Sequence, residues 1–441
     1  MIKRLIVICI AIISSSVFAQ QGTASPYSFY GIGSLKFKGT VENRSMGGMG
    51  VYLDSIHLNL RNPASYVGKN IDAYPFEGES RPVKFAVAGT TSNVKLKGDS
   101  GEIDGNSATF DYIALSVPIG KFGFGFGLLP FTSVGYKLDD INNNDDIINR
   151  FRGEGGVNRV FAGFGYQISK KLGFGVDINY NFGNIQNSAI EFAYTPEGEL
   201  IELQTREDSR SDLSGLNVNF GLAYKTKISD KLELSATATY APQSQLSSEN
   251  ERSYSTIIIN TVTEREVTLN TIEADLDAQN LRNTKLTLPS RWSIGTGIGR
   301  PQSWFVGAEY TLQSTSDFDN PFYSNEVSSF ENASEIAVGG FYIPDFDAFS
   351  GYLKRVVYRA GVNFSNTGLV VKNETIKQFG ISFGLGLPVG QRSSDPFSNL
   401  NLGFELGRRG TTNNNLIQEN FINFNVSLNL NSRWFKQRKY N

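Results

Sequence analysis

The end of the chain alternates regularly between apolar and polar residues. Apolar residues occupy every second position from Ile422 to Leu430, and asparagine or serine fills the positions between them. Successive side chains of a β-strand point to opposite faces, so this stretch predicts a strand from Phe421 to Phe435 with one apolar and one amide-rich face. Trp434 closes the strand and basic residues follow, which is the order expected at an aromatic girdle of a membrane barrel.

The same alternation recurs along most of the chain, often as two strands joined by a short polar turn such as Ser169-Lys170-Lys171. An even number of strands can close antiparallel and leave no unpaired edge in lipid. The sequence therefore predicts an all-β fold, a transmembrane antiparallel β-barrel of about fourteen strands. The predicted strands are 83–97, 107–119, 121–138, 156–168, 171–190, 211–227, 230–245, 285–299, 303–316, 331–343, 353–365, 375–388, 398–410 and 419–435.

Three connections are long and polar, at 139–155, 191–210 and 246–284, and we expect them to be extracellular loops. The first contains Asp139, Asp140, Asp145 and Asp146. These carboxylates suggest a site for divalent cations that bridge lipopolysaccharide, and the alternative is an ordinary solvated loop.

The first residues have the form of a signal peptide. Lys3 and Arg4 precede a short apolar run, and small residues lead to a cleavage site predicted after Ala19. The run is shorter than the roughly 20 residues that a spanning helix needs. We therefore expect export of the chain and a location in the outer membrane of a Gram-negative cell. Cys9 lies in this predicted peptide, so the mature chain would hold no disulfide, thiolate metal site or thiol nucleophile.

Residues 20–70 do not follow the strand pattern. They mix aromatic residues with glycine-rich turns, which predicts a compact, irregular segment. Such a segment ahead of a barrel can fold into the lumen, so we divide the chain into a signal peptide (1–19), an N-terminal hatch or plug (20–70) and a barrel (71–441).

Composition alone does not distinguish a soluble protein from a membrane barrel. The formal charge of −2 becomes −4 when Lys3 and Arg4 leave with the signal peptide, and this mild acidity argues against a nucleic-acid partner. The mean hydropathy of −0.23 would suit a soluble protein. In a transmembrane barrel only alternate residues face lipid, so the mean stays low there too.

The sequence offers little for catalysis. Its one histidine, His57, lies just before the Asn-Pro-Ala turn and on no predicted strand. We interpret it as a packed or solvent-exposed residue and not as a catalytic one. There is no Gly-x-Ser-x-Gly turn and no Cys/His cluster. Glycines at 123, 125 and 127 and at 295, 297 and 299 alternate inside strands with no helix after them, so they are no phosphate loops. We predict no enzyme activity, no catalytic residue, no cofactor and no metal site.

Several short motifs carry a resemblance to a known family. They are Ser45-Met46-Gly47-Gly48-Met49-Gly50, Asn62-Pro63-Ala64, the strand around Phe124–Phe131 and the pair formed by Leu288-Pro289 and Trp304–Tyr310. These resemble the FadL-type outer-membrane transporters of long-chain fatty acids and aromatic hydrocarbons. The two ends of the mature chain, 25–33 and 431–440, are similar to barrel proteins of the Bacteroidetes.

The resemblance implies fourteen strands, a hatch in the lumen that includes Gly47, Gly48, Asn62, Pro63 and Ala64, and a side exit where the third strand bends inward. That strand contains Pro130, followed by Phe131, and proline in a strand marks a bulge or a break. These two residues are therefore candidates for a lateral gap, and the alternative is an ordinary proline near a strand end.

Three arginines on predicted strands, Arg159, Arg291 and Arg359, are candidate cations of the lumen. We interpret them first as members of a structural ion-pair ladder on the polar inner face. No residue can be matched to a ligand carboxylate.

Three functions remain open at this stage. The first is passive uptake of a hydrophobic small molecule, similar to a long-chain fatty acid, by a monomeric barrel in contact with outer-membrane lipids and lipopolysaccharide. The second is protein handling, as a FadL-like shuttle component of type IX secretion with secretion-system proteins as partners. The third is a porin or structural barrel, which a hatch argues against.

Overall fold

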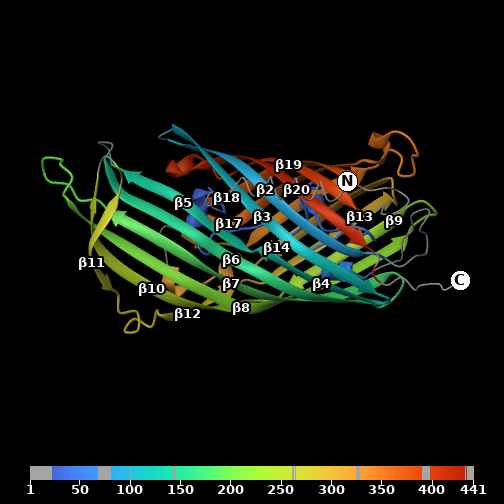
Figure 1. The fold of residues 1–441 in the computed structure, drawn as a ribbon, viewed down its shortest axis with the longest axis horizontal. Coiled ribbons are helices and arrows are strands. Elements are labelled where there is room, and N and C mark those ends of the chain that lie inside the picture. The colour runs from blue at the N-terminus through green and yellow to red at the C-terminus, as the bar shows by residue number, and fades with distance from the viewer. Residues whose placement is uncertain are drawn as a thin grey trace.

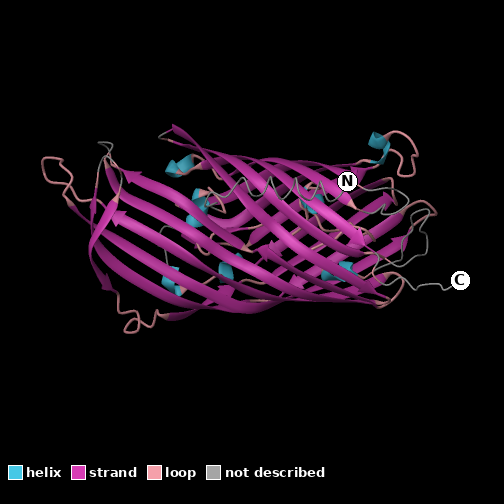
Figure 2. Ribbon diagram, in the orientation of Figure 1, coloured by secondary structure: helices cyan, strands magenta, loops and turns pink. Residues whose placement is uncertain are grey.

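The computed structural model describes residues 22–67, 81–99, 101–142, 146–260, 263, 265–323, 328–389, 398–432 and 434 of the 441 residues. Strands dominate, and the helices are single turns (Figure 2). The helices are η1 (Pro26–Phe29), α2 (Val41–Arg44), η2 (Pro63–Tyr66), η3 (Thr315–Asp317), η4 (Pro321–Tyr323), η5 (Tyr352–Arg355) and η6 (Asn413–Asn415). No helix in these ranges is long and apolar enough to cross a membrane.

The strands are β1 (Ser34–Leu35), β2 (Val83–Gly98), β3 (Gly101–Ile119), β4 (Phe122–Pro130), β5 (Thr132–Ile141), β6 (Ile147–Gln167), β7 (Leu172–Glu191), β8 (Leu203–Lys227), β9 (Glu233–Ala241), β10 (Ser244–Ile259), β11 (Glu266–Glu273), β12 (Asn283–Leu288), β13 (Arg291–Arg300), β14 (Trp304–Gln313), β15 (Ser328–Phe330), β16 (Ala333–Tyr342), β17 (Val357–Val371), β18 (Glu374–Pro388), β19 (Asn399–Arg409) and β20 (Gln418–Ser432).

These strands close into one antiparallel barrel, as Figure 1 shows. The last strand, β20, pairs with β2 from Val83↔Ser432 to Lys97↔Gln418, and this pairing seals the wall. Consecutive strands such as β9 and β10 share one position in the wall, so the predicted count of fourteen is confirmed. The fourteen positions are β2, β3, β4 with β5, β6, β7, β8, β9 with β10, β12 with β13, β14, β15 with β16, β17, β18, β19 and β20.

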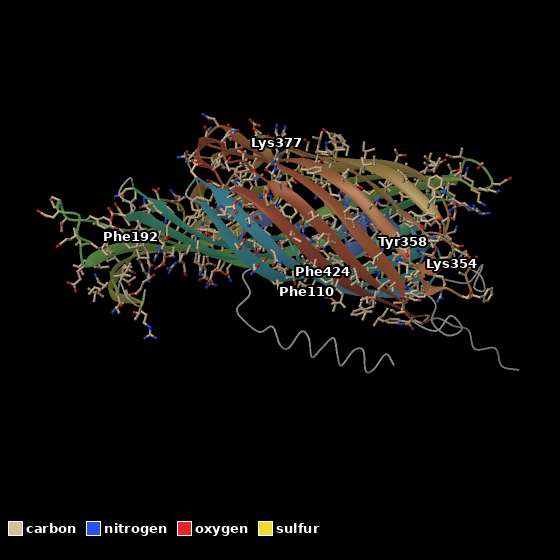
Figure 3. The ribbon with its side chains drawn as sticks, turned by 90° about the horizontal axis from the view of Figure 1, so that it is seen from above. Phe110, Phe192, Lys354, Tyr358, Lys377 and Phe424 are labelled. Carbon is tan, nitrogen blue, oxygen red and sulfur yellow. The ribbon has the colours of Figure 1, made fainter. Side chains whose placement is uncertain are left out.

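The two faces of the wall are reversed relative to a soluble protein. In β20, Phe424 is 48% exposed on the outside, whereas Asn425 is 1% exposed on the inside. Phe110 on β3 and Phe424 both lie on the outer surface (Figure 3). A soluble sandwich would place its apolar residues inward, so this arrangement indicates a wall that faces lipid.

Aromatic residues lie in rows near both ends of the wall. Trp304 pairs with Tyr342, which pairs with Tyr358, close to the short turns. Nearer the long connections, the rings of Trp292 and Tyr310 meet edge to face with their centroids 6.2 Å apart. These rows match the two aromatic girdles expected at the membrane interfaces.

The prediction of three long loops was largely wrong. Strands β5, β6, β7, β8 and β10 continue through most of those stretches and project beyond the rest of the wall with β11, on the left of Figure 1. Phe192 marks this projecting end and Lys354 the opposite end in Figure 3. The extensions are polar because they stand outside lipid, where ion pairs across strands replace apolar contacts: Arg206 pairs with Glu266 at 2.8 Å. The sequence predicts loops in these stretches because their hydrophobicity is low.

The acidic stretch is also paired within itself. Arg150 donates to both carboxylate oxygens of Asp139 at 2.8 and 3.0 Å. In the part of the chain that the structure describes, no group of three or more His, Cys, Asp or Glu residues could hold a metal ion. Asp145 lies outside the described residues, and a cation bridge to lipopolysaccharide stays a prediction.

Residues 22–67 run through the interior of the barrel and contact the inner faces of strands all around it. Hydrogen bonds join this N-terminal segment to β3 (Val41), β18 (Gly47), β14 (Gly50) and β8 (Asn62). The predicted signal peptide lies outside the described residues.

Candidate functional site

Gly47 and Gly48 lie in the turn that follows α2. Their φ angles are +72° and +92°, which a residue with a side chain rarely adopts. The amide of Gly47 donates to Ser382 Oγ of β18 at 2.9 Å, and the amide of Gly48 donates to the carbonyl of Asn43 at 2.9 Å. A Cβ on Gly361 of β17 would collide with Gly47, so the backbone of the N-terminal segment packs directly against the backbone of the wall here.

The Asn62-Pro63-Ala64 turn is packed against the opposite side of the wall. Asn62 Oδ1 accepts a hydrogen bond from the amide of Ala64 at 2.9 Å and so caps η2, with Pro63 at its first position. Cβ atoms on wall residues Gly175 and Gly221 would collide with this turn. The glycines of the wall thus make room for the segment, which their alternation in the sequence did not reveal.

Tyr66, which sequence reasoning missed, follows this turn. Its ring lies over Gly125 and Gly163, and its hydroxyl donates to Asp177 Oδ1 at 2.9 Å. Lys38 Nζ lies 3.7 Å from the other oxygen of Asp177. The only available signal was one acidic residue, Asp177, in a run from 172 to 190 that has no other charged residue.

Arg61 and Glu309 form a second buried link between segment and wall. The Arg61 guanidinium donates to Glu309 Oε1, and Glu309 Oε2 accepts from the amide of Gly50 at 2.7 Å. Both side chains of the ion pair are less than a tenth exposed. Neither residue stood out in the sequence, since ion pairs between distant residues leave no local pattern.

A cavity of about 510 Å³ lies between the N-terminal segment and the wall, toward the projecting end of the barrel. Its lining mixes aromatic residues with many charges. The charged residues that line it are Lys36, Lys38, Arg44, Arg61, Arg159, Arg291 and Arg409, with Asp111, Glu309, Glu335, Glu405 and Glu419. Burial lowers the pKa values of Lys36 and of Lys38 to about 8, while nearby carboxylates oppose the shift.

The three candidate arginines have different surroundings. Arg159 lines the cavity, donates to Asn181 Oδ1 at 2.8 Å and lies 3.9 Å above the Phe131 ring. Arg291 lies 3.9 Å from Glu335 in the same cavity. Arg359 is buried elsewhere and donates to Asn401 at 3.0 Å. Among the described residues, Arg291 alone of the three has the ion pair that the ladder interpretation requires.

Pro130 and Phe131 lie where the third position of the wall is interrupted. Strand β4 ends at Pro130, and its pairing with β3 stops at Ile113↔Leu128, although β3 continues to Gly101. Beyond this point β5 pairs with β6 and with β1, and no pairing with β3 occurs among the described residues. The wall therefore lacks a ladder between β3 and β5, and both Pro130 and Phe131 line the cavity beside it.

The first described residues lie in this interruption. Ala24 is close enough to Gly105 of β3 that a Cβ there would come within 2.9 Å of the Ala24 Cβ. Gly22 lies against Ser133 of β5 and accepts a hydrogen bond from Lys36 Nζ. Residues 22–24 thus lie between β3 and β5, which are not paired with each other.

His57 is paired with Asp54, whose Oδ2 lies 2.5 Å from His57 Nδ1. Burial alone would raise the pKa of Asp54, but His57 and Lys84 outweigh it and lower that pKa. Both residues belong to the N-terminal segment, and Lys84 of the wall strand β2 donates to the His57 carbonyl at 2.8 Å. These contacts indicate a structural part for His57.

Together these features define the class of protein: a closed, lipid-facing β-barrel with its N-terminal segment bound inside and a discontinuity in its wall. A family model described as BamG matches residues 1–441, so the chain belongs to the BamG family. No curated protein matches this sequence.

Solved structures of hydrocarbon channels have a similar fold. The toluene transporter TodX of P. putida is 16% identical, covers 91% of this chain and 100% of its own, and gives a TM-score of 0.57. A FadL homologue of Pseudomonas aeruginosa has 11% identity, the same coverages and a TM-score of 0.56. The CymD monoaromatic hydrocarbon channel has 13% identity, again with those coverages, and a TM-score of 0.54. The fold is therefore that of the FadL-type barrels.

Proposed function

We propose that this protein is an outer-membrane channel for passive uptake of amphipathic or hydrophobic small molecules similar to long-chain fatty acids. The observation that carries the proposal is the 510 Å³ cavity beside the stretch of wall where β3 and β5 form no ladder. The cargo would leave sideways between β3 and β5, past Pro130 and Phe131, and would not need to cross a polar lumen. In this proposal residues 1–19 direct export, residues 20–70 form a hatch and residues 71–441 form the barrel. The barrel would act as a monomer in the outer membrane of a Bacteroidetes cell.

The charges of the cavity favour an amphipathic cargo over a pure hydrocarbon. Lys36, Lys38 and Arg44 belong to the N-terminal segment, so an anionic head group could approach the hatch directly. The rings of Tyr27, Tyr30 and Phe131 offer surface for a chain.

A porin function is less well supported. A second cavity also lies inside the barrel, and it shares no lining residue with the first among the described residues. The N-terminal segment separates them, as a plug would.

The proposal is tested by purifying the barrel in mild detergent and identifying bound molecules by mass spectrometry. Reconstituted vesicles would then be assayed for uptake of labelled dodecanoate. We expect a bound amphiphile and uptake above that of vesicles without protein. A stoichiometric secreted protein, with detergent alone in the cavity and no uptake, would instead support the protein-handling function.

Binding of an anionic amphiphile should weaken as the pH rises from 7 to 9. Lys36 and Lys38 lose their charge as the pH passes their pKa values of about 8, so attraction for a carboxylate is present below that pH and lost above it. One unit above the pKa only about a tenth of a lysine is protonated, so affinity should fall by up to roughly tenfold for each lysine. Titration with dodecanoate at each pH measures this.

The matched control for this measurement replaces both lysines by arginine. Arginine keeps its charge throughout this range, so the double variant Lys36→Arg/Lys38→Arg should show a nearly flat profile. An equally steep profile in that variant would show that other groups cause the dependence.

A further inference from the structure

A second cavity, of about 230 Å³, lies on the other side of the N-terminal segment. Residues of the short turns, including Lys170, Lys171 and Pro301, form part of its lining. The cavity therefore reaches the end of the barrel opposite the projecting strands.

The floor of this cavity is apolar and comes from both the segment and the wall. Met46, Phe341 and Ile343 are all less than a tenth exposed and belong to one cluster. The ring of Tyr52 packs against Phe341 with the centroids 4.7 Å apart. This floor would accept a short hydrocarbon chain.

The lining of this cavity contains more cationic side chains than carboxylates. Arg81 is 7% exposed and donates to the Tyr66 carbonyl at 3.0 Å through Nη2, and its Nη1 has no hydrogen-bond partner among the residues that the structure describes. Within the described ranges Nε of Arg355 also has no hydrogen-bond partner. Lys170 and Lys171 lie at the rim of the cavity.

The three carboxylates of the lining have partners of their own. Asp54 pairs with His57, and Glu233 pairs with Lys225 at 2.8 Å. Glu42 accepts a hydrogen bond from Asn401 at 2.9 Å and lies near the charge of Arg359. A buried guanidinium with an unused donor is costly unless an anion completes it.

We propose that this cavity binds a single-chain amphiphile with an anionic head group. The head group would meet Arg81, with Lys170 and Lys171 beside it, and the chain would lie over Met46, Tyr52 and Phe341. A volume of 230 Å³ is below the usual range of small-molecule pockets, about 300–1,000 Å³, so it holds a short chain and excludes a folded protein element. The site goes beyond the proposed uptake, because it requires no passage through the wall.

The test uses the full mature barrel in lipid nanodiscs and decanoate that carries a photoreactive group at its chain end. We expect cross-links in residues 46–58 and 341–346. Decyl phosphate should compete because its head group is also anionic, whereas decanol should not. Arg81→Gln should weaken binding by about tenfold, as expected for the loss of one charge-assisted hydrogen bond.

Two further variants guard against misfolding of Arg81→Gln. The double variant Lys170→Gln/Lys171→Gln changes only exposed turn residues and should also weaken binding. Lys121→Gln lies on an exposed turn at the same end, outside the lining, and should leave binding unchanged.

The result also separates this site from the proposed uptake. Cross-links confined to residues 23–38 of the first cavity would overturn the second site and leave the uptake proposal intact. Cross-links at the second cavity without uptake of dodecanoate by vesicles would support the second site and contradict the uptake proposal.

Discussion

Replacing Glu309 by leucine should release the N-terminal segment from the wall while the barrel stays closed. The change leaves the Arg61 guanidinium buried without its carboxylate and removes the acceptor of the Gly50 amide. Breaking a buried ion pair costs about 3–5 kcal/mol, because the remaining charge has lost its partner and cannot reach water. Hydrogen exchange of the amides of residues 41–66 should therefore become much faster, and that of the strands should change little.

Two companion variants make this measurement specific. Glu405 also faces inward, but it accepts its hydrogen bond from the wall residue Asn423, so Glu405→Leu should leave exchange of the segment nearly unchanged. The double variant Arg61→Met/Glu309→Leu removes both charges and should be less damaging than Glu309→Leu alone. Unchanged exchange in Glu309→Leu would mean that this pair does not hold the segment.

The wall was predictable from the sequence because its physics is local. Each strand of a lipid-facing barrel repeats every two residues, so the alternation from Ile422 to Leu430 reveals both the strand and its two faces. The count of fourteen followed from the same signal. The strand ends were not predictable, because polar extensions such as those of β6 and β8 lose the apolar half of the pattern where they leave the membrane.

The interior was only partly predictable. Glycine motifs marked the turns at Gly47 and at Asn62, since backbone conformation is set locally. The residues that join the segment to the wall, such as Arg61 with Glu309, are 248 positions apart, and a single sequence holds no trace of their contact. The wall glycines under Tyr66 have no sequence feature that separates them from other strand residues, because their role depends on contact with the N-terminal segment.

Pro130 of the third strand was identifiable from the sequence, but its structural consequence was not. Pro130 indicated a break, because proline cannot donate to a ladder. The sequence did not indicate that the β4-facing edge of β3 would have no strand partner for more than ten residues beyond its last pairing with β4, nor that residues 22–24 would lie there. Those features depend on the path of the N-terminal segment.

A disulfide that fixes residue 24 to β3 should abolish uptake reversibly. Ala24→Cys and Gly105→Cys would place the two Cβ atoms about 2.9 Å apart, and a small shift of the N-terminal residues reaches the spacing of roughly 3.8 Å that a disulfide needs. The one native cysteine, Cys9, belongs to the predicted signal peptide, so the new pair would be the only thiols of the mature chain. If cargo leaves between β3 and β5, residues 22–24 must move aside, and the oxidised barrel should transport no more dodecanoate than empty vesicles do.

Reduction with dithiothreitol should restore uptake in the same sample, which separates a closed exit from a misfolded barrel. The matched control keeps Gly105→Cys and pairs it with Val94→Cys, because these two residues already face each other in the β2–β3 ladder. That disulfide staples strands that do not separate, so oxidation should leave uptake unchanged. Equal uptake by the oxidised and reduced Ala24→Cys/Gly105→Cys barrel would show that the cargo takes another route, even if the channel itself transports dodecanoate.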